Sequence, residues 1–303
     1  MEKLTKEKKY FKYIDKNIKN LNEKDTVLIL GATGSMASYL ALYLSYLHCN
    51  LVLAARNLKE VEELKNQLKE YDVKIETVYV DYSNIKSIDE IVTFVKKHKI
   101  TKIINNIGIY HQPTKFINNI EWTFYINYLA PFYLFESLKE VIKTNNISVI
   151  NVGSISYLFK KINFDDVESL RVKNKTLRYS QSKSFLMSYS EYLKSLGINS
   201  IIVHPGITTT NLFAKKNNAY PKIFYLLIVP IMKVLFMSYK KAALSLLLGC
   251  DKKEVPELKW IGPRGLFHSW GYPNVQKLRK SRFNKKDIEL RYSKSLEYIK
   301  KMN

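Results

Sequence analysis

The stretch TVLILGATGSMAS, residues 26–38, joins an apolar run to a helix-like segment through a glycine-rich turn. The apolar run at residues 26–30 predicts a buried strand, and the apolar pattern at residues 36–47 predicts the helix that follows it. A glycine-rich turn in this position lets the backbone approach a pyrophosphate group, which then binds at the N-terminus of the helix. The stretch therefore predicts a phosphate-binding turn at the start of an α/β fold.

Within this turn, Gly31 is expected to make the tight bend and Gly34 to allow the close approach of the phosphate. Ser35 and Ala37 stand at later positions where glycine is more usual, and both are small enough to keep the turn. The Ser35 hydroxyl can itself contact phosphate. An ordinary structural loop is the alternative, and the position between a strand and a helix argues against it.

Apolar runs and helical patterns alternate along most of the chain. This alternation predicts a doubly wound parallel α/β sheet of about seven strands, with helices on both faces. The runs are almost continuously apolar, which is typical of strands buried on both sides. The predicted strands lie at residues 26–30, 50–54, 74–81, 101–106, 148–152, 198–205 and near 258–262.

No repeat and no Pro/Gly/Ser-rich linker divides the chain, so we expect one domain at residues 25–272 with two appendages. The first is an N-terminal helical extension, residues 1–24, and the second is a basic helical tail, residues 273–303. Four apolar residues of the extension fall at helical spacing. They favour docking on the domain, and binding to a lipid surface is the alternative. These residues are Phe11, Ile14, Ile18 and Leu21.

Composition narrows the class of protein. Among 303 residues, 49 Lys and Arg against 27 Asp and Glu give a net charge of +22. This charge can indicate nucleic acid or anionic membrane as a partner, but codon bias in an AT-rich genome explains it equally well, and no nucleic-acid-binding motif accompanies it. Cys49 and Cys250 lie far apart and the five histidines are scattered, so no metal site is expected. With no signal peptide, we expect a cytoplasmic protein with reduced thiols.

The end of the second predicted strand bears on the choice of cofactor. A site specific for NAD(H) usually has a carboxylate there, which bonds the ribose 2′-hydroxyl. This chain has Ala55 and then Arg56, whose forked guanidinium suits a 2′-phosphate. The sequence thus favours NADP(H) over NAD(H), and a solvated loop cation is the alternative reading of Arg56.

Several motifs beyond the glycine turn resemble those of the short-chain dehydrogenase/reductase family. YSQSK at residues 179–183 is similar to its Tyr-x-x-x-Lys signature, and INVGSIS at 150–156 to its serine-bearing strand end. NNIG at 105–108 and VHPGITTTNL at 203–212 are similar to its Asn-Asn-Ala-Gly motif and Pro-Gly turn. The motifs follow the family's order from about residue 25 to 212, with weaker similarity to about 273. The resemblance implies a Rossmann-like fold and a nicotinamide-dependent oxidoreductase.

The resemblance also implies a catalytic set of Tyr179, Lys183, Ser154 and Asn127. Tyr179 would exchange a proton with the substrate, and Ser154 would hydrogen-bond the substrate oxygen. Asn127 would hold a water that resupplies protons. A free phenol has a pKa near ~10, and a nearby cation lowers that value. Because Lys183 follows Tyr179 by one helical turn, we expect Lys183 to lower the pKa of Tyr179.

The implied cofactor contacts come from the turns that follow the strands. Asp81 can instead cap the next helix, and Asn105 can be a satisfied sheet-end amide. We interpret His111 and His204 as structural, because the family pattern needs no histidine. The implied contacts are Gly31, Thr33, Gly34, Ser35, Met36, Arg56, Asp81, Tyr82, Asn105, Asn106, Ile107, Gly108, Tyr179, Lys183, Pro205, Gly206, Ile207, Thr208 and Thr210.

Two segments bear on the substrate. The long interval between Ser154 and Tyr179 resembles that of retinol-dehydrogenase-like members and predicts a loop at the mouth of the site. Residues from about 213 to 238 predict a helical lid, which is too short and too interrupted to span a membrane. Its apolar residues favour a lipophilic ketone, aldehyde or alcohol, and an ordinary core helix pair is the alternative. The apolar wall candidates are Ile223, Phe224, Leu226, Leu227, Ile231, Leu235, Phe236 and Met237.

Other partners and functions stay open at this stage. Lys215, Lys216, Lys222 and Lys233 leave open a peripheral membrane contact, and the sequence does not decide for or against a homo-oligomer. A non-catalytic scaffold of the same fold, binding cofactor or a membrane surface, is one alternative to the oxidoreductase. A sugar-nucleotide epimerase or dehydratase is another, favoured by the Gly31–Gly34 spacing.

Overall fold

A computed structural model describes residues 3–110, 112–159, 161–208, 237–265 and 268–302. Most of the expected lid, including seven of the eight wall candidates, lies outside these residues, as do Thr210 and His111. Met237 is the wall candidate that the structure describes, and it is buried.

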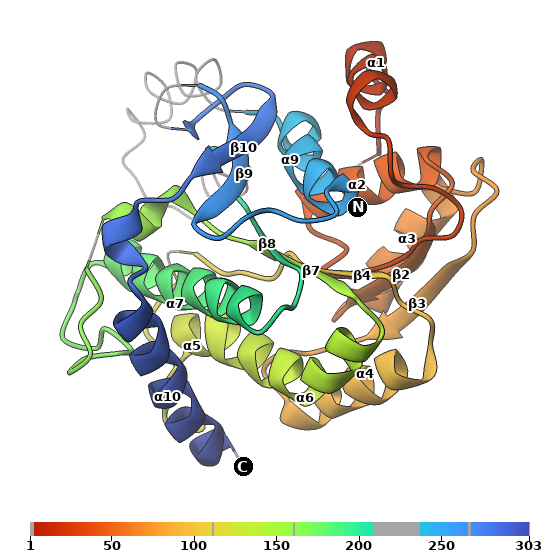
Figure 1. Cartoon of the computed structure of the whole chain (residues 1–303). Coiled ribbons are helices and arrows are strands. Elements are labelled where there is room, and N and C mark those ends of the chain that lie inside the picture. The colour runs from red at the N-terminus through yellow and green to blue at the C-terminus, as the bar shows by residue number, and fades with distance from the viewer. Residues whose placement is uncertain (1–2, 111, 160, 209–236, 266–267, 303) are drawn as a thin grey trace, which may run out of the picture.

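The centre of the molecule is an eight-stranded sheet with the order β10-β9-β8-β7-β4-β1-β2-β3 (Figure 1). The seven strands from β3 to β9 in this order pair in parallel, as the sequence predicted, and β10 pairs with β9 in antiparallel fashion. The strand order reverses between β1 and β4, so the carboxyl ends of these two strands flank the point where ligands of such sheets usually bind. The bounds are β1 Thr26–Leu30, β2 Asn50–Ala55, β3 Ile75–Tyr79, β4 Lys102–Asn105, β7 Ser148–Val152, β8 Ser200–Val203, β9 Lys259–Pro263 and β10 Pro273–Lys277.

Helices cover both faces of the sheet (Figure 1). Side chains alternate between the faces along a strand, so Val27 and Ile29 enter one core and Leu28 and Leu30 the other. The first core also contains α1, α2, α3 and α9, and the second contains α4, α6, α7 and α10. The bounds are α1 Lys8–Asn17, α2 Ser35–Tyr46, α3 Leu58–Gln67, α4 Ile85–Lys97, α6 Ala130–Thr144, α7 Lys175–Ser195, α9 Tyr239–Asp251 and α10 Lys285–Met302.

The segment after residue 272 differs in part from the wholly helical tail that we expected. Its first five residues form β10, which extends the sheet at its edge. An edge strand can carry Pro273 at its first position, because the missing N–H costs no hydrogen bond inside the sheet. The remainder is mostly helical, and α10 packs against α7 (Figure 1). The hydroxyl groups of Ser295 and Tyr128 share a buried hydrogen bond.

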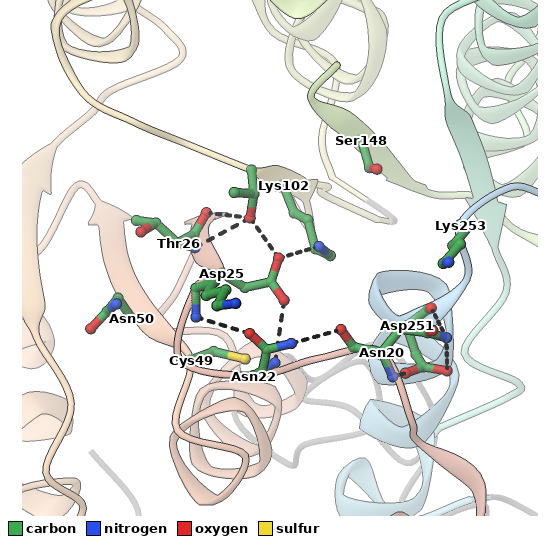
Figure 2. A network of polar contacts seen from close by, with 12 residues as sticks. Asn20, Asn22, Asp25, Thr26, Cys49, Asn50, Lys102, Ser148, Asp251 and Lys253 are labelled. Carbon is green, nitrogen blue, oxygen red and sulfur yellow. Dashed lines mark hydrogen bonds and ion pairs between the residues drawn. The ribbon is translucent and has the colours of Figure 1, made fainter. Parts of the chain in front are cut away.

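The N-terminal extension is tied to the amino ends of the strands by a polar network (Figure 2). The Asp25 carboxylate accepts hydrogen bonds from the Thr101 hydroxyl (2.9 Å) and the Lys102 ammonium group. The backbone N–H groups of Lys19 and Asn20 donate to one Asp251 oxygen at 2.8 and 2.6 Å. Because the Asn22 N–H also donates to the Asp25 carboxylate at 3.3 Å, the network fastens the extension to β1, β4 and α9 at the end of the sheet opposite the glycine turn. Within the described part of the chain, no helix is long and apolar enough to cross a membrane.

Candidate active site

The glycine turn follows β1 as the sequence predicts. Gly31 has a φ of +76°, which side-chain-bearing residues rarely adopt, and its N–H donates to the Ala54 carbonyl at 2.8 Å. The Asn106 side chain donates to the Gly31 carbonyl at 3.3 Å, which joins the end of β4 to the turn. Among the residues that the structure describes, no side chain caps the N-terminus of α2, and its first turn contains no acidic residue. This helix end can therefore accept an anion.

The next turn along the sheet edge carries Arg56. Ala55 ends β2 in the core, and Arg56 is exposed directly after it. Asn57 caps α3 by accepting a hydrogen bond from the Glu60 N–H at 3.4 Å. Arg56 thus lies at the same end of the sheet as the glycine turn, since β1 and β2 pair in parallel.

Three of the expected cofactor residues have structural contacts of their own. The Asp81 carboxylate accepts from the Ser83 N–H (2.9 Å) and hydroxyl (2.7 Å), so it organises the turn before α4. Tyr82 is buried in the core. The Asn105 side chain donates to the Asn151 side chain at 2.9 Å, within the interior of the sheet. The structure therefore places the Asn105 amide among buried groups and not in the open turn.

Asn127 lies in a π-helical turn, η1 (Tyr125–Leu129), between the short helix α5 (Trp122–Phe124) and α6. It is fully buried, and its carboxamide bonds both backbone groups of Ile109: it accepts from the N–H at 2.7 Å and donates to the carbonyl at 2.9 Å. Its amide also donates to the Ser182 hydroxyl at 3.1 Å. Such π-turns often occur at functional sites, because they turn side chains out of the helical register.

Lys183 reaches from α7 to the end of β7, where its ammonium group donates to the Val152 carbonyl at 2.8 Å. A Cβ atom on Gly108 would lie 3.2 Å from the Lys183 Nζ atom and 3.7 Å from the Asn127 Oδ1 atom, so the missing side chain leaves room for both. Burial lowers the pKa of Lys183 to about 8. The sequence-predicted Lys183, Gly108 and Asn127 are thus brought together at one place.

The prediction that Lys183 lowers the pKa of Tyr179 is wrong for this structure. Burial raises the pKa of Tyr179 to about 12, a hydrogen bond with Ser154 opposes that rise, and the neighbouring Tyr110 adds to it. The Lys183 Nζ atom lies 5.9 Å from the centre of the Tyr179 ring. The loss of hydration around the phenol outweighs the influence of the cation, because the ammonium group is turned toward the Val152 carbonyl.

The Ser154 side chain stands between the strand end and Tyr179. Its hydroxyl oxygen accepts from the Ser156 N–H at 3.2 Å and caps the short 3-10 helix η2 (Ile155–Leu158). The hydrogen bond with Tyr179 comes in addition to this cap. The Ser154 hydroxyl therefore both caps η2 and contacts the Tyr179 side chain.

The turn at residues 205–208 follows β8. Thr208 forms a parallel β-bridge with Met237, so these two residues lie side by side. His204, just before this turn, is buried and stacks on Trp260 with ring centres 5.0 Å apart. Burial lowers the pKa of His204 to about 3, which keeps the ring neutral and fits its interpretation as a structural residue.

Sequence reasoning did not identify two side chains beside Tyr179. The Tyr110 ring meets the Tyr179 ring edge-on at 4.9 Å, and its hydroxyl shares a 2.9 Å hydrogen bond with Thr176. The Ser182 hydroxyl donates to the Tyr179 carbonyl at 2.8 Å and so links Asn127 to α7. Ser182 stood inside the YSQSK motif and could have been found there, whereas no sequence pattern marks Tyr110.

The loop between Ser154 and Tyr179 is held by buried side chains that flank Tyr179. Gln181 donates to the Asp166 and Val167 carbonyls at 2.7 and 2.6 Å, and Arg178 donates to the Val172 carbonyl at 3.1 Å. The Glu168 carboxylate accepts from the Glu121 N–H at 2.5 Å and from the Tyr298 hydroxyl of α10 at 2.9 Å. Residues 166–172 of this loop are thus held in place next to the catalytic candidates.

Comparison with known proteins agrees with this geometry. The family model described as short chain dehydrogenase matches residues 25–221. The mouse protein named retinol dehydrogenase 14 is 28% identical over 207 residues, which cover 62% of this chain and 62% of the mouse protein. The match therefore spans less than two thirds of that relative's length.

Solved structures share the fold. The crystal structure of an uncharacterized protein from Mycobacterium paratuberculosis has a TM-score of 0.70 at 20% identity, over 93% of this chain and 95% of the other. A short-chain dehydrogenase from Sphingobium yanoikuyae, solved in complex with NADPH, has a TM-score of 0.58 at 19% identity, over 76% and 85% of the two chains. Since the family model covers more than half of the residues, the chain belongs to the short-chain dehydrogenase family of oxidoreductases.

Proposed function

We propose that the protein interconverts a carbonyl and an alcohol on a lipophilic substrate and uses NADP(H). The observation that carries the proposal is the meeting of four side chains from three parts of the fold, at the end of the sheet that bears the glycine turn: Tyr179 and Lys183 from α7, Ser154 from the turn after β7, and Asn127 from η1. A scaffold that only binds cofactor has no need for a buried ammonium group beside a half-buried phenol at this position, because removing both groups from water is costly.

The residues present fit a nicotinamide dinucleotide. Gly31 and Gly34 leave the backbone of the turn accessible, and the N-terminus of α2 offers unpaired N–H groups to a pyrophosphate. Arg56 would pair with a 2′-phosphate, and Lys183 would bond the nicotinamide ribose. Pro205–Thr208 would lie at the nicotinamide end.

The chain's own residues perform the proton chemistry. When bound, the dinucleotide supplies or accepts the hydride. In carbonyl reduction, Tyr179 donates its proton to the substrate oxygen, and a pKa of about 12 keeps the phenol protonated at neutral pH. Ser154 donates a hydrogen bond to the same oxygen, and the positive charge of Lys183 stabilises the negative charge that develops there. Asn127 holds Ile109 and Ser182 in place around this centre.

Two observations support a lipophilic substrate. Phe159 and Leu170 lie in the loop between Ser154 and Tyr179, and they are 58% and 48% exposed although both side chains are apolar. The similar mouse protein carries the name retinol dehydrogenase 14. A carbonyl compound with a long apolar group would bury such side chains on binding, which favours association.

We expect Arg56→Ala to raise the Kd of NADPH by about 10- to 100-fold, because charge-assisted hydrogen bonds to the 2′-phosphate are lost. The Kd of NADH should change by less than about 3-fold, since NADH has no such phosphate. Titration of cofactor fluorescence measures both values. Lys59→Ala, which removes a neighbouring exposed cation, is the matched control. Equal losses for the two cofactors would refute the assignment of Arg56.

The pH dependence of carbonyl reduction should follow Lys183. Its pKa of about 8 means that the ammonium group is charged below pH 8 and neutral above it, while Tyr179 stays protonated up to about pH 12. We therefore expect kcat/KM to be level between pH 6 and 7.5 and to fall through about pH 8. A profile that stays level to pH 10 would contradict this role of the Lys183 charge.

The whole proposal is tested by NADPH titration followed by a screen of long-chain ketones and aldehydes. Consumption of NADPH with an apolar carbonyl, and little with a short polar one, is the expected result. Binding without turnover of any carbonyl would favour the non-catalytic scaffold. Turnover of a nucleotide sugar would favour the epimerase or dehydratase.

A further inference from the structure

The turn at residues 205–208 is held from two sides through one residue. The Ile207 N–H donates to the Ser269 carbonyl at 3.1 Å, and the Ile207 carbonyl accepts from the Met237 N–H at 2.8 Å. A Cβ atom on Gly206 would lie 2.7 Å from the Met237 Sδ atom and 2.9 Å from the Ser269 oxygen. The segments around Met237 and Ser269 therefore fix the position of this turn.

Helix α1 contacts the first of these segments. Tyr10 is buried, and its hydroxyl shares a 3.2 Å hydrogen bond with the Ser238 hydroxyl, directly after Met237. Ser238 also caps α9 by accepting from the Lys241 N–H at 3.3 Å. The Lys240 ammonium group donates to the Glu7 carboxylate at 2.6 Å. The extension is thus hydrogen-bonded to the chain at Ser238 and Lys240, directly after Met237.

The same helix contacts the second segment. The Tyr13 ring stacks on the Tyr272 ring, with centres 4.6 Å apart and planes at 10°. The Lys241 ammonium group lies 4.8 Å from the centre of the Tyr272 ring. The Tyr272 carbonyl accepts from the Arg264 N–H at 3.2 Å and closes the connection between β9 and β10, which contains Ser269. Tyr13 therefore supports the connection that contains Ser269, whose carbonyl accepts the hydrogen bond from the Ile207 N–H.

We propose that α1 positions the turn at residues 205–208 and so sets the affinity for the nicotinamide half of the cofactor, with Tyr10 and Tyr13 as positioning residues. This inference rests on the proposed function, because it takes the turn to be the nicotinamide end of the site. Tyr10 and Tyr13 act through two independent segments on the two backbone groups of one residue. Loss of both contacts frees the turn from both sides, whereas the glycine turn and Arg56 are not held by these two tyrosines.

The test compares two ligands on the full chain with Tyr10→Phe and Tyr13→Ala combined. Tyr10→Phe keeps the buried ring and removes the hydrogen bond, and Tyr13→Ala removes the stacked ring. We expect the Kd of NADPH to rise by about 3- to 10-fold. The Kd of adenosine 2′,5′-bisphosphate, which lacks nicotinamide, should change by less than about 2-fold. Lys12→Ala on the exposed side of α1 is the control and should leave both values unchanged.

Hydrogen exchange provides a second readout that needs no ligand. The amides of Ile207 and Met237 should exchange faster in the double variant than in the wild type, while the amides of β1 keep their rates. Unchanged NADPH affinity, an equal loss for both ligands, or unchanged exchange at both amides would overturn the positioning role. A wild type that fails to bind NADPH would instead count against the proposed function, and the exchange rates would still decide whether α1 holds the turn.

Discussion

Tyr179→Phe should lower kcat for carbonyl reduction by about 10³-fold or more, because general acid catalysis contributes roughly 10²- to 10⁴-fold and phenylalanine has no proton to donate. The Kd of NADPH should change by less than about 2-fold, since the ring keeps its edge-on contact with Tyr110. Single-turnover kinetics with NADPH and a lipophilic ketone measure the chemical step directly.

A matched control separates the hydroxyl of Tyr179 from the aromatic environment. Tyr110→Phe removes the neighbouring hydroxyl and its hydrogen bond with Thr176, but keeps the ring against Tyr179. We expect a loss of less than about 10-fold in this variant. Full activity in Tyr179→Phe, or equal losses in both variants, would eliminate Tyr179 as the proton donor.

Lys183→Met should abolish most activity and yet make the fold more stable at pH 7. The pKa of Lys183 falls from 10.5 to about 8 on burial, so the charged form costs the folded state about 3 kcal/mol. Methionine removes this cost and fills similar space, but it leaves the Val152 carbonyl without its donor, at about 1 kcal/mol. We expect the free energy of unfolding to rise by about 1–2 kcal/mol at pH 7, measured by urea denaturation.

The sign of the effect can be checked against pH. Because the folded pKa of Lys183 lies below the unfolded value, the unfolded chain binds more protons between pH 8 and 10.5, and wild-type stability rises across this window. The advantage of Lys183→Met should therefore shrink as the pH rises from 8 to 10.5. Lys12→Met, at an exposed position, should show no such trend. A variant that is less stable than wild type at pH 7 by 2 kcal/mol or more would contradict a costly buried charge.

The parts of the fold that the sequence predicted are those with local causes. The central parallel strands are nearly continuous apolar runs, because both of their faces are buried, and Gly31 marks a turn that needs a positive φ. The edge strand β3, IETVY, is only partly buried and less apolar. The strand β10 could not be predicted in this way. Its residues 273–277 include Asn274, Gln276 and Lys277, and they form a strand only because β9 offers an unpaired edge.

In the candidate site too, the features with a local cause in the sequence were predicted, and those that depend on packing were not. The motifs placed Asn127, Ser154, Tyr179 and Lys183 correctly near one another, since each motif comes at the end of a strand or on an adjoining helix. The direction of the Tyr179 pKa shift was missed, because it depends on how much water the folded chain removes from around the phenol. The π-turn at Asn127 was also missed, since it arises from packing and not from a local pattern.

The contacts of the loop between Ser154 and Tyr179 have a consequence for the order in which the chain folds. Its Glu168 is bonded by Tyr298, and the Met302 carbonyl accepts a 3.1 Å hydrogen bond from the Asn118 side chain, across 130 and 184 residues of chain. A ribosome must therefore synthesise residues up to about 302 before these contacts can form, long after the glycine turn has been made. Contacts of such sequence separation form late. A nascent chain would assemble the part around β1 to β4 first and complete the loop between Ser154 and Tyr179 last.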